Sequence, residues 1–501
     1  MDLLPQVYAI GPELLLILGG MVVLTFDMLI GDHEHPLLPG LTGVILLAAL
    51  VWSFFLIPDD LGLSEGVAFG MFAIDNLTYF FRVFALFTAL FVLILTIDYI
   101  KGRTRQSGEF YSFLIFITLA VIATSAANNL ILIYLAFEFL SLTSYVMVGW
   151  LRHHERSNEA AMKYLLYGAV SSAIMLYGMS LLYGATGTTN VNEIAAAFTG
   201  AAGVQSQVSG LFNIGISAAV LMMVGFGFKV ALVPFHQWSP DAYEGAPTPV
   251  TTFLAVGPKA AGFAIMIRVL LIALEGQTEL WQTLLSSVAI LTMVIGNITA
   301  LVQTDMKRLL AYSSIAQAGY ILMGLVANNP ADNLGLQATL FYLLAYLFTN
   351  VGIFVAVVAY EQDTGSTNIA DYKGLIHRSP FLAIAVVVFL LSLLGIPPTA
   401  GFLGKFFVFG AAIRGELYVL AIVGVLTSVI SAYYYLKVIR YMFFPSEEKE
   451  STPVQYGFPL KLTVGVTLAA TLLMNIFPGP FLELIGQPSQ LMTQALMMLP
   501  F

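Results

Sequence analysis

The stretch GIPPTAGFLGKFFVF, Gly395–Phe409, places two adjacent prolines and one lysine inside an apolar run. Proline removes the backbone hydrogen bond to the carbonyl four residues earlier, so this pair frees the carbonyls of Leu393 and Leu394. Freed backbone groups survive at membrane depth only where they are buried in protein or line water. The stretch therefore predicts a membrane helix that is broken beside Lys405.

The whole chain has the composition of a polytopic membrane protein. Of its 501 residues, 59% are apolar and 10% are charged, against roughly 25% charged residues in a soluble domain. About fourteen apolar runs are long enough to cross a bilayer, and they are too continuous for the strands of a barrel. The predicted fold is an all-α membrane helix bundle. The runs begin near residues 9, 37, 77, 110, 129, 159, 211, 247, 281, 308, 335, 380, 415 and 457.

Composition also excludes several kinds of chemistry. The chain contains no cysteine, which removes disulfides, iron–sulfur ligation and thiolate metal sites. No cofactor is therefore expected in this chain, and any redox chemistry belongs to partners. The formal net charge of -9 argues against a nucleic-acid partner.

Basic residues lie at alternate loops, with Arg414 as the main exception. The positive-inside rule places the basic loops in the cytoplasm and both termini outside. No linker divides the chain, so one transmembrane domain is predicted over residues 1–501, with N-terminal helices in 9–100 and a C-terminal helix and tail in 457–501. The apolar tail Pro480–Phe501 is expected to lie in the interface or on a neighbour.

Five ionisable residues fall inside predicted helices: Glu138, Lys163, Lys229, Lys259 and Lys405. A central charge costs ~2.5 to 3.5 kcal/mol, so a set of them indicates function. Loss of hydration disfavours the charged form of a lysine, and a nearby carboxylate favours it. We expect Glu138 and Lys229 to form a pair whose spacing sets the proton affinity of the lysine. The alternative is snorkelling or structural ion pairing, which suits Lys163 best because it lies only about one turn inside its helix.

Each of the three deep lysines lies near a proline, and the seventh and twelfth helices are predicted to be broken. These two helices run in opposite directions and are five helices apart, which predicts two inverted repeats of five helices at 110–275 and 281–444. The pairs of lysine and proline are Lys229 with Pro234, Lys259 with Pro258, and Lys405 with Pro397 and Pro398.

Other polar residues have weaker signals. His236 follows the break in the seventh helix, where it could relay a proton, although a solvated loop histidine fits equally well. Tyr342, Tyr346 and Asn350 share one helix face and could hold water between Lys259 and Lys405, or form a satisfied buried stripe. The charges of Asp305, Lys307 and Arg308 are expected to be a cap and an anchor.

Three motifs resemble the antiporter-like membrane subunits of complex I, the respiratory NADH:quinone oxidoreductase, and the resemblance covers nearly the whole chain. Within that family Glu138, Lys163, Lys229, Lys259 and Lys405 match the charged residues of the proton path. The motifs are FKVALVPFHQWSPDAYEGAPTPVT (228–251), DMKRLLAYSSIAQAGYILMG (305–324) and LSLLGIPPTAGFLGKFFVF (391–409).

The resemblance implies a proton-translocating subunit in a bacterial inner membrane, driven by quinone reduction elsewhere. It implies that NADH, FMN, iron–sulfur clusters and quinone are bound by partner subunits, and that other antiporter-like subunits and lipids are neighbours. Two alternatives remain open. One is a subunit of a multi-subunit (Mrp-type) sodium/proton antiporter, and the other is a purely structural scaffold of the membrane arm.

Overall fold

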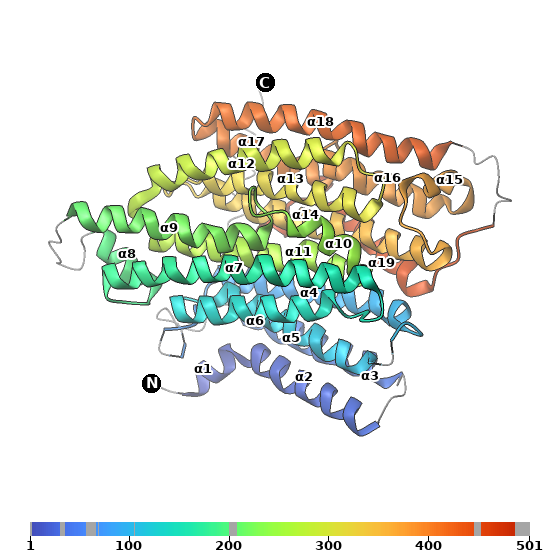
Figure 1. The fold of residues 1–501 in the computed structure, drawn as a ribbon, viewed down its shortest axis with the longest axis horizontal. Helices are drawn as coiled ribbons and strands as arrows, with labels where there is room; N and C mark the ends of the chain where they lie inside the picture. Colours follow the sequence, from blue (N-terminus) through green and yellow to red (C-terminus); the bar gives the residue numbers. More distant parts are fainter. Residues whose placement is uncertain are drawn as a thin grey trace. The chain divides into compact units, whose positions relative to one another are not determined.

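The structure, a computed structural model, is built from helices (Figure 1). It describes residues 3–30, 36–56, 67–68, 70–104, 106–199, 208–444 and 452–485, and these ranges contain no β-strand. Twelve helices in the described ranges are long and apolar enough to cross a membrane, and two shorter apolar helices cover Ile214–Val230 and Pro380–Leu394. The predicted all-α membrane bundle is confirmed, whereas the number of about fourteen spans stays a prediction.

The described residues group into two compact units, and the first comprises residues 1–93, 100–231 and 257–284. Within it α7 packs along α9, and α2 packs against α3 and α5. Its helices are α1 (Leu3–Ala9), α2 (Gly11–Ile30), α3 (Leu37–Phe54), most of α4 (Asn76–Ile100), α5 (Ser107–Ala126), α6 (Leu130–Val148), α7 (Glu155–Thr186), α8 (Val191–Thr199), α9 (Val208–Val230), the second part of α11 (Thr248–Met266) with the π-helix Ile267–Ala273, and the 3-10 helix Glu275–Gln277.

The second unit comprises residues 94–99, 232–256 and 285–501. Helix α14 lies at its centre and packs against α13, α16, α17 and α19, because most of its residues are apolar and most of them are buried. The helices of this unit are α10 (Trp238–Gly245), the first part of α11, most of α12 (Thr278–Ala300), α13 (Met306–Val326), α14 (Leu334–Thr364), α15 (Leu375–Arg378), α16 (Pro380–Leu394), α17 (Ala400–Arg414), α18 (Tyr418–Phe443), α19 (Phe458–Ile476), α20 (Gly479–Leu484) and the 3-10 helix Ile369–Tyr372.

Both predicted helix breaks are present. Helix α9 ends at Val230, where Ala231 adopts a φ of 61°, and α10 begins at Trp238. Helix α16 ends at Leu394, and α17 begins at Ala400. The third proline behaves differently, because Pro258 lies inside α11 without ending it. Pro258 is thus accommodated within its helix, whereas Pro234 lies in the break that follows Ala231, where the chain leaves helical φ and ψ.

Two of the three long polar connections contain short helices. The segment Ala185–Ser209 contains α8, and Gln362–Ser379 contains a 3-10 helix and α15, so neither is a plain loop. Most of the third connection, Pro58–Ala73, lies outside the described residues. The same is true of the predicted interfacial tail beyond Ile485.

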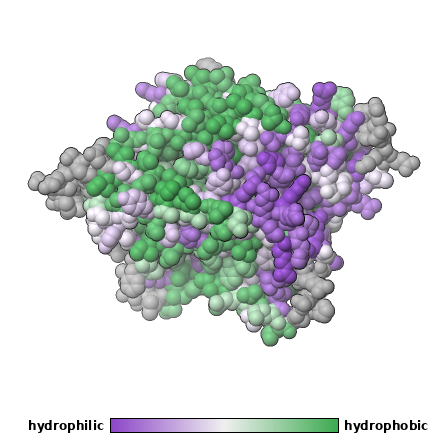
Figure 2. All heavy atoms as spheres, viewed as in Figure 1, coloured by the Kyte–Doolittle hydropathy of each residue, from purple (hydrophilic) through white to green (hydrophobic). Residues whose placement is uncertain are grey.

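Apolar side chains cover broad areas of the visible surface (Figure 2). The helix α18 is an example, because its exposed residues are large and apolar and recur at helical spacing. This arrangement is expected for a helix that faces lipid, whose acyl chains need no polar surface. The exposed side chains include Val419, Ile422, Leu426, Val429 and Tyr433, each between 59% and 69% accessible.

Gly401 is predicted to be required for the second break. A Cβ atom placed on Gly401 would lie 1.9 Å from the carbonyl oxygen of Ser392. We expect Gly401→Ala to destabilise the protein by about 1 to 3 kcal/mol, because α17 must move away from α16. Gly184→Ala is the matched control, since a Cβ there meets nothing within 4 Å. Thermal unfolding in detergent checks both, and equal melting temperatures would contradict the prediction.

Candidate functional site

Lys229 lies in the last turn of α9 and is completely buried. Its Nζ donates a hydrogen bond to Ser141 Oγ on α6 at 3.0 Å. The same ammonium lies 5.4 Å from the ring centroid of Phe137 and 5.9 Å from that of Tyr164. Among the described residues no carboxylate forms an ion pair with it. Lys229 is therefore held at the first break by neutral partners on α6 and α7.

Glu138 lies one helical turn before Ser141 on the same face of α6. The two are three residues apart, and Glu138 interacts electrostatically with Lys229. Its Oε1 atom is buried and has no hydrogen-bond partner among the described residues. The predicted pair is thus not in contact here, because Lys229 binds Ser141 instead. Ser141 and Glu138 lie one turn apart on α6, so the ammonium that binds Ser141 is separated from the carboxylate of Glu138.

Lys259 lies on α11, directly after Pro258, and only 1% of its surface is accessible. One turn further along, Gly262 lies against α9. A Cβ atom on Gly262 would lie 2.5 Å from Val230 Cγ1 and 3.5 Å from Lys229 Cβ. The absence of a side chain at Gly262 therefore lets the helix that carries Lys259 approach the helix that carries Lys229 closely.

Two of the predicted site residues have more open surroundings. Lys163 forms an ion pair with Glu159 of the same helix at 2.8 Å, and 41% of its side chain is accessible. Such an exposed pair between residues four apart stabilises a helix by only a few tenths of a kcal/mol. His236 lies between α9 and α10 and is half-buried, and its Nδ1 has no partner among the described residues.

Lys405 lies on α17 at the second break and is 4% accessible. Its Nζ donates to the carbonyl of Leu394 at 2.9 Å and to Ser428 Oγ at 2.7 Å. The ammonium also lies 4.4 Å from the ring centroid of Tyr320. The neighbouring freed carbonyl, that of Leu393, accepts from Gln317 Nε2 at 2.8 Å. Both carbonyls that the double proline releases are thus satisfied, and one of them is satisfied by the lysine itself.

A network of tyrosines and amides surrounds Lys405. Tyr320 donates to Thr427 and accepts from Asn297, and Asn297 accepts from Tyr434. A second branch runs through Gln317, which accepts from Tyr342. The sequence did not single out Gln317 or Tyr320, because their spacing on α13 is that of ordinary buried residues. The only feature of the sequence that pointed to them is the motif DMKRLLAYSSIAQAGYILMG, which contains both residues.

The predicted polar stripe on α14 is buried, and its members have different surroundings. Tyr342 binds Gln317, and Asn350 donates to the carbonyl of Tyr346. The hydroxyl of Tyr346 is buried and has no partner among the described residues. Two members of the stripe are therefore satisfied within the protein.

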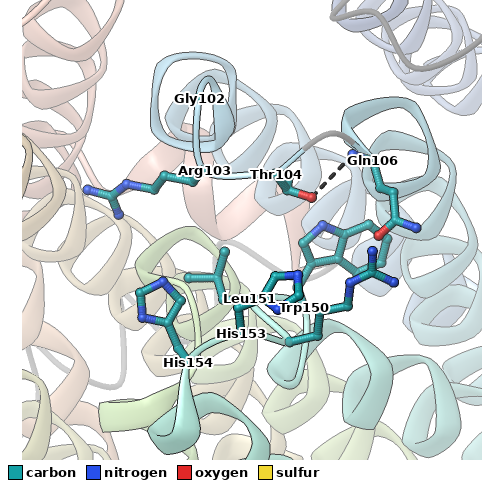
Figure 3. A pocket seen from close by; sticks show the side chains of 9 residues that line it. Gly102, Arg103, Thr104, Gln106, Trp150, Leu151, His153 and His154 are labelled. Carbon is teal, nitrogen blue, oxygen red and sulfur yellow. Dashed lines mark hydrogen bonds between the residues drawn. The ribbon is translucent and has the colours of Figure 1, made fainter.

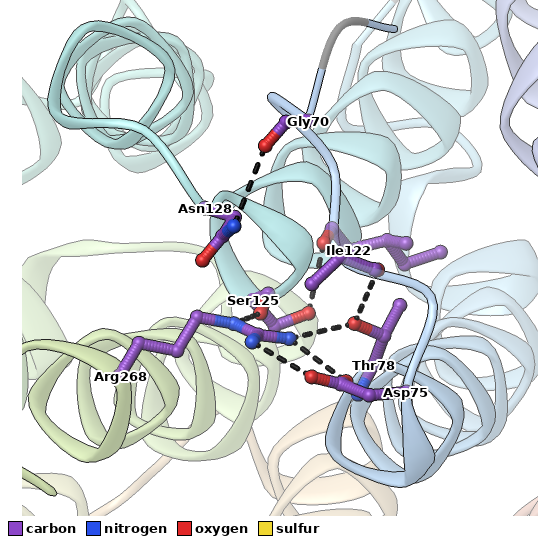
Figure 4. Close-up of polar contacts among 8 residues, drawn as sticks. Gly70, Asp75, Thr78, Ile122, Ser125, Asn128 and Arg268 are labelled. Carbon is purple, nitrogen blue, oxygen red and sulfur yellow. Dashed lines mark hydrogen bonds and ion pairs between the residues drawn. The ribbon is translucent and has the colours of Figure 1, made fainter. Parts of the chain in front are cut away.

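Three further buried charges were not expected from the sequence. Arg82 and Glu13 form an ion pair at 2.7 Å. Arg268, in the π-helical segment, is 1% accessible and donates to both carboxylate oxygens of Asp75, at 2.9 Å each. It also donates to Thr78 Oγ1 and to the carbonyl of Ser125 (Figure 4). Both arginines have a carboxylate partner, which is the arrangement of structural residues, although Glu13 Oε2 has no partner among the described residues.

The cluster Asp305, Lys307 and Arg308 has partners within the protein. Asp305 caps α13 by accepting from the backbone N–H of Arg308 at 2.9 Å, as predicted. Lys307 donates to the carbonyls of Glu244 and Ala246 at the C-terminal end of α10, which satisfies groups that the helix leaves unpaired. Arg308 binds Asp241 and Glu244. The cations therefore hold α10 in place, rather than acting only as an anchor to the membrane.

The arrangement at the two breaks suits the movement of protons and offers no metal site. Within the described ranges no group of three or more His, Cys, Asp or Glu residues could bind a metal ion. Neutral acceptors such as Ser141 and Ser428 hydrogen-bond an ammonium, and their hydroxyls can equally donate to a neutral amine. Lys229 and Lys405 thus keep a hydrogen-bond partner whether or not they carry a proton.

The chain is similar to known membrane proteins over most of its length. The family described as "NADH:quinone oxidoreductase/Mrp antiporter, TM" matches residues 127–431. An "NAD(P)H-quinone oxidoreductase subunit 2" of Gloeothece citriformis is 42% identical, covering 95% of this chain and 92% of that one. An "NADH-quinone oxidoreductase subunit N" of Desulforamulus reducens is 38% identical, covering 96% and 98%.

Solved structures give the same result. A chain of respiratory complex I from Thermus thermophilus superimposes with a TM-score of 0.76 at 33% identity, covering 94% of this chain and 98% of that one. A chain of the Mrp complex from Dietzia reaches a TM-score of 0.80 at 21% identity, covering 99% and 100%, a likeness in fold alone. On the extent of these matches, the chain belongs to the NADH:quinone oxidoreductase/Mrp antiporter transmembrane family.

Proposed function

We propose that the chain is a proton-translocating membrane subunit of a respiratory NADH:quinone oxidoreductase, the counterpart of subunit N. One observation carries the proposal. Lys229 and Lys405 are each buried at a helix break with only neutral hydrogen-bond partners, in separate compact units. A lysine so placed takes up and releases a proton without losing its contacts. The two units correspond only loosely to the proposed inverted repeats at 110–275 and 281–444.

The proposed path uses Glu138, Lys229, Lys259 and Lys405, with Lys163 and His236 at its edges. Quinone reduction in other subunits would drive charge rearrangement along this row, and each charge would alter the proton affinity of the next. NADH, FMN, iron–sulfur clusters and quinone belong to those partner subunits, so this chain contributes to a translocase without a redox centre of its own. The proposed location is a bacterial inner membrane, with both termini on the outer side.

The Mrp-type antiporter is the second candidate, favoured by the shared fold. The purified assembly distinguishes the two. Flavin and iron–sulfur absorbance, with proton uptake into vesicles on adding NADH, supports the oxidoreductase. Sodium-dependent proton exchange by an assembly without redox centres would overturn it. The scaffold alternative predicts normal proton pumping when the buried lysines are replaced.

The pair Glu138 and Lys229 gives a separate prediction. We expect Glu138→Gln and Lys229→Met each to lower the number of protons pumped per electron. Glu138→Gln removes the negative charge that raises the proton affinity of Lys229, and Lys229→Met removes the group that takes up the proton. Ser141→Ala is expected to have a smaller effect in the same direction, since it removes only the hydrogen-bond partner of Lys229. The measurement is proton uptake against NADH oxidation in vesicles of normally assembled complex. Normal stoichiometry in both charge variants would contradict the role of the pair.

A further inference from the structure

A surface pocket of about 550 Å³ lies between two loops of the first unit. One loop joins α4 to α5, and the other joins α6 to α7. Its volume is within the range of small-molecule sites, about 300 to 1,000 Å³. Figure 3 shows its lining, which includes Arg103, Thr104, Trp150, Arg152, His153 and His154.

The lining is rich in hydrogen-bond donors and contains no carboxylate. Arg103 and Arg152 are permanently cationic, and each imidazole of His153 and His154 has an N–H in either tautomer. Thr104 Oγ1 already accepts from the backbone N–H of Gln106, so its own proton is left to donate. Arg152 forms no ion pair with a carboxylate among the described residues, whereas in a surface pocket of the second unit Arg378 is bound to Asp363 at 3.2 Å. The first pocket therefore selects an anion.

Trp150 gives an independent indication of a ligand. Only 9% of this residue is accessible, yet its indole Nε1 has no hydrogen-bond partner among the described residues. The ring is held by edge contacts with Phe110 and Phe113, at centroid distances of 5.1 and 5.6 Å. In Figure 3 the nitrogen lies on the side of the ring that faces Thr104, which also lines the pocket. A buried donor without an acceptor is costly, and an oxygen atom of a bound anion would satisfy it.

The position of the pocket identifies the source of the anion. Helices α4, α5, α6 and α7 are all candidate membrane spans, and the pocket lies where they end. That is the level of lipid headgroups in a bilayer. Exposed apolar side chains recur along α6 toward the pocket, so acyl chains have a surface to follow. They are Ile131, Leu135, Phe139, Leu142 and Val146.

We propose that this pocket binds the phosphate group of an anionic phospholipid, with Arg152 and the indole N–H of Trp150 as its principal donors. The headgroup of phosphatidylglycerol brings a negative charge and no cation. The headgroup of phosphatidylcholine adds a quaternary ammonium, which the cations of the lining repel. The site is separate from the lysine row in its residues, so the proposal does not depend on the proposed function.

The test uses the full chain in its purified, assembled complex, reconstituted with a photo-crosslinkable phosphatidylglycerol. Labelled peptides are identified by mass spectrometry. Three variants are compared: Trp150→Phe, which keeps an aromatic ring but removes the indole N–H, Arg152→Gln, and the control Arg156→Gln. The control makes the same change of charge nearby at a residue that does not line the pocket.

We expect labelling of the two loops in the unaltered protein. Trp150→Phe and Arg152→Gln should each reduce it at least about tenfold, the effect of losing one hydrogen bond to a charged group. Arg156→Gln should leave it unchanged. Equal labelling of all three variants would overturn the proposal. The absence of any labelling of these loops in the unaltered protein, as expected if a neighbouring subunit fills the pocket, would overturn it too. Inorganic phosphate that displaced the lipid at equal concentration would reassign the pocket to free phosphate and overturn it as well.

Discussion

Lys405→Met is expected to reduce proton pumping coupled to NADH oxidation by about a hundredfold, the lower end of the effects seen when a proton-transferring group is lost. Methionine has a similar length and can fill the space, but it cannot take up a proton. Methionine also removes the hydrogen bond from Lys405 to the carbonyl of Leu394, which then accepts from Ser428 as its one remaining side-chain donor among the described residues. The measurement is proton uptake per electron in vesicles that contain equal amounts of assembled complex.

A second replacement separates proton transfer from the need for a fixed positive charge. Lys405→Arg keeps a cation and its donors, but a guanidinium does not release its proton in a protein. We expect Lys405→Arg to fail nearly as completely as Lys405→Met. If the arginine variant pumped normally, Lys405 would be a structural cation, and the scaffold alternative would be favoured.

The control for both replacements is Lys437→Met on α18, the helix that also carries Ser428. Lys437 is half-buried, and its Nζ is 3.4 Å from the carbonyl of Gln303, a weak hydrogen bond. We expect this variant to pump normally. The comparison excludes a general effect of removing a lysine from this part of the protein.

Asp75→Ala is expected to lower the free energy of unfolding by about 2 to 4 kcal/mol. Two losses add. The buried guanidinium of Arg268 loses both carboxylate contacts, and α4 loses its N-cap, because Asp75 also accepts from the backbone N–H of Thr78 at 2.8 Å. The carboxylate is 43% accessible, so water compensates Arg268 in part, and the figure lies below that for a fully buried pair.

The control for Asp75 is Asp332→Asn, which breaks the more exposed ion pair with Arg414. Exposed pairs contribute about 0 to 1 kcal/mol, so the melting temperature should change little. Thermal unfolding of the two variants in the same detergent checks the comparison. An equal loss of stability in both would contradict the importance of the Arg268 contacts.

The same contacts predict a dependence on pH. Burial alone would raise the pKa of Asp75, but the charge and hydrogen bonds of Arg268, with those of Thr78, hold it below its ordinary value of 3.8. Asp75 then binds a proton more readily in the unfolded chain than in the folded one. Its contribution to stability is therefore complete above the ordinary pKa and is lost as the pH falls through the lowered pKa of the folded state. The stability difference between the protein and Asp75→Asn should therefore shrink on acidification below pH 3.8. A constant difference would contradict this assignment.

Much of the helical architecture follows from local sequence. Apolar runs predict membrane helices because the bilayer allows no unpaired backbone, and the double proline with Gly395 predicts the break between α16 and α17. The depth of Lys229, Lys259 and Lys405 also follows from position within a run. All three are buried as expected.

Only the tertiary structure decided which groups these charges contact. Arg268 binds Asp75 across 193 positions of the chain, and Lys229 binds Ser141 across 88, so no local pattern contains either contact. The sequence predicted Glu138 as the partner of Lys229, but the packing of α6 and α9 against α7 places a serine one turn away at the ammonium. Helix formation depends on neighbours in sequence and on the bilayer, whereas side-chain partners depend on how distant helices pack. For that reason the sequence by itself determined the helices, their breaks and the buried lysines, and the fold determined the hydrogen bonds around them.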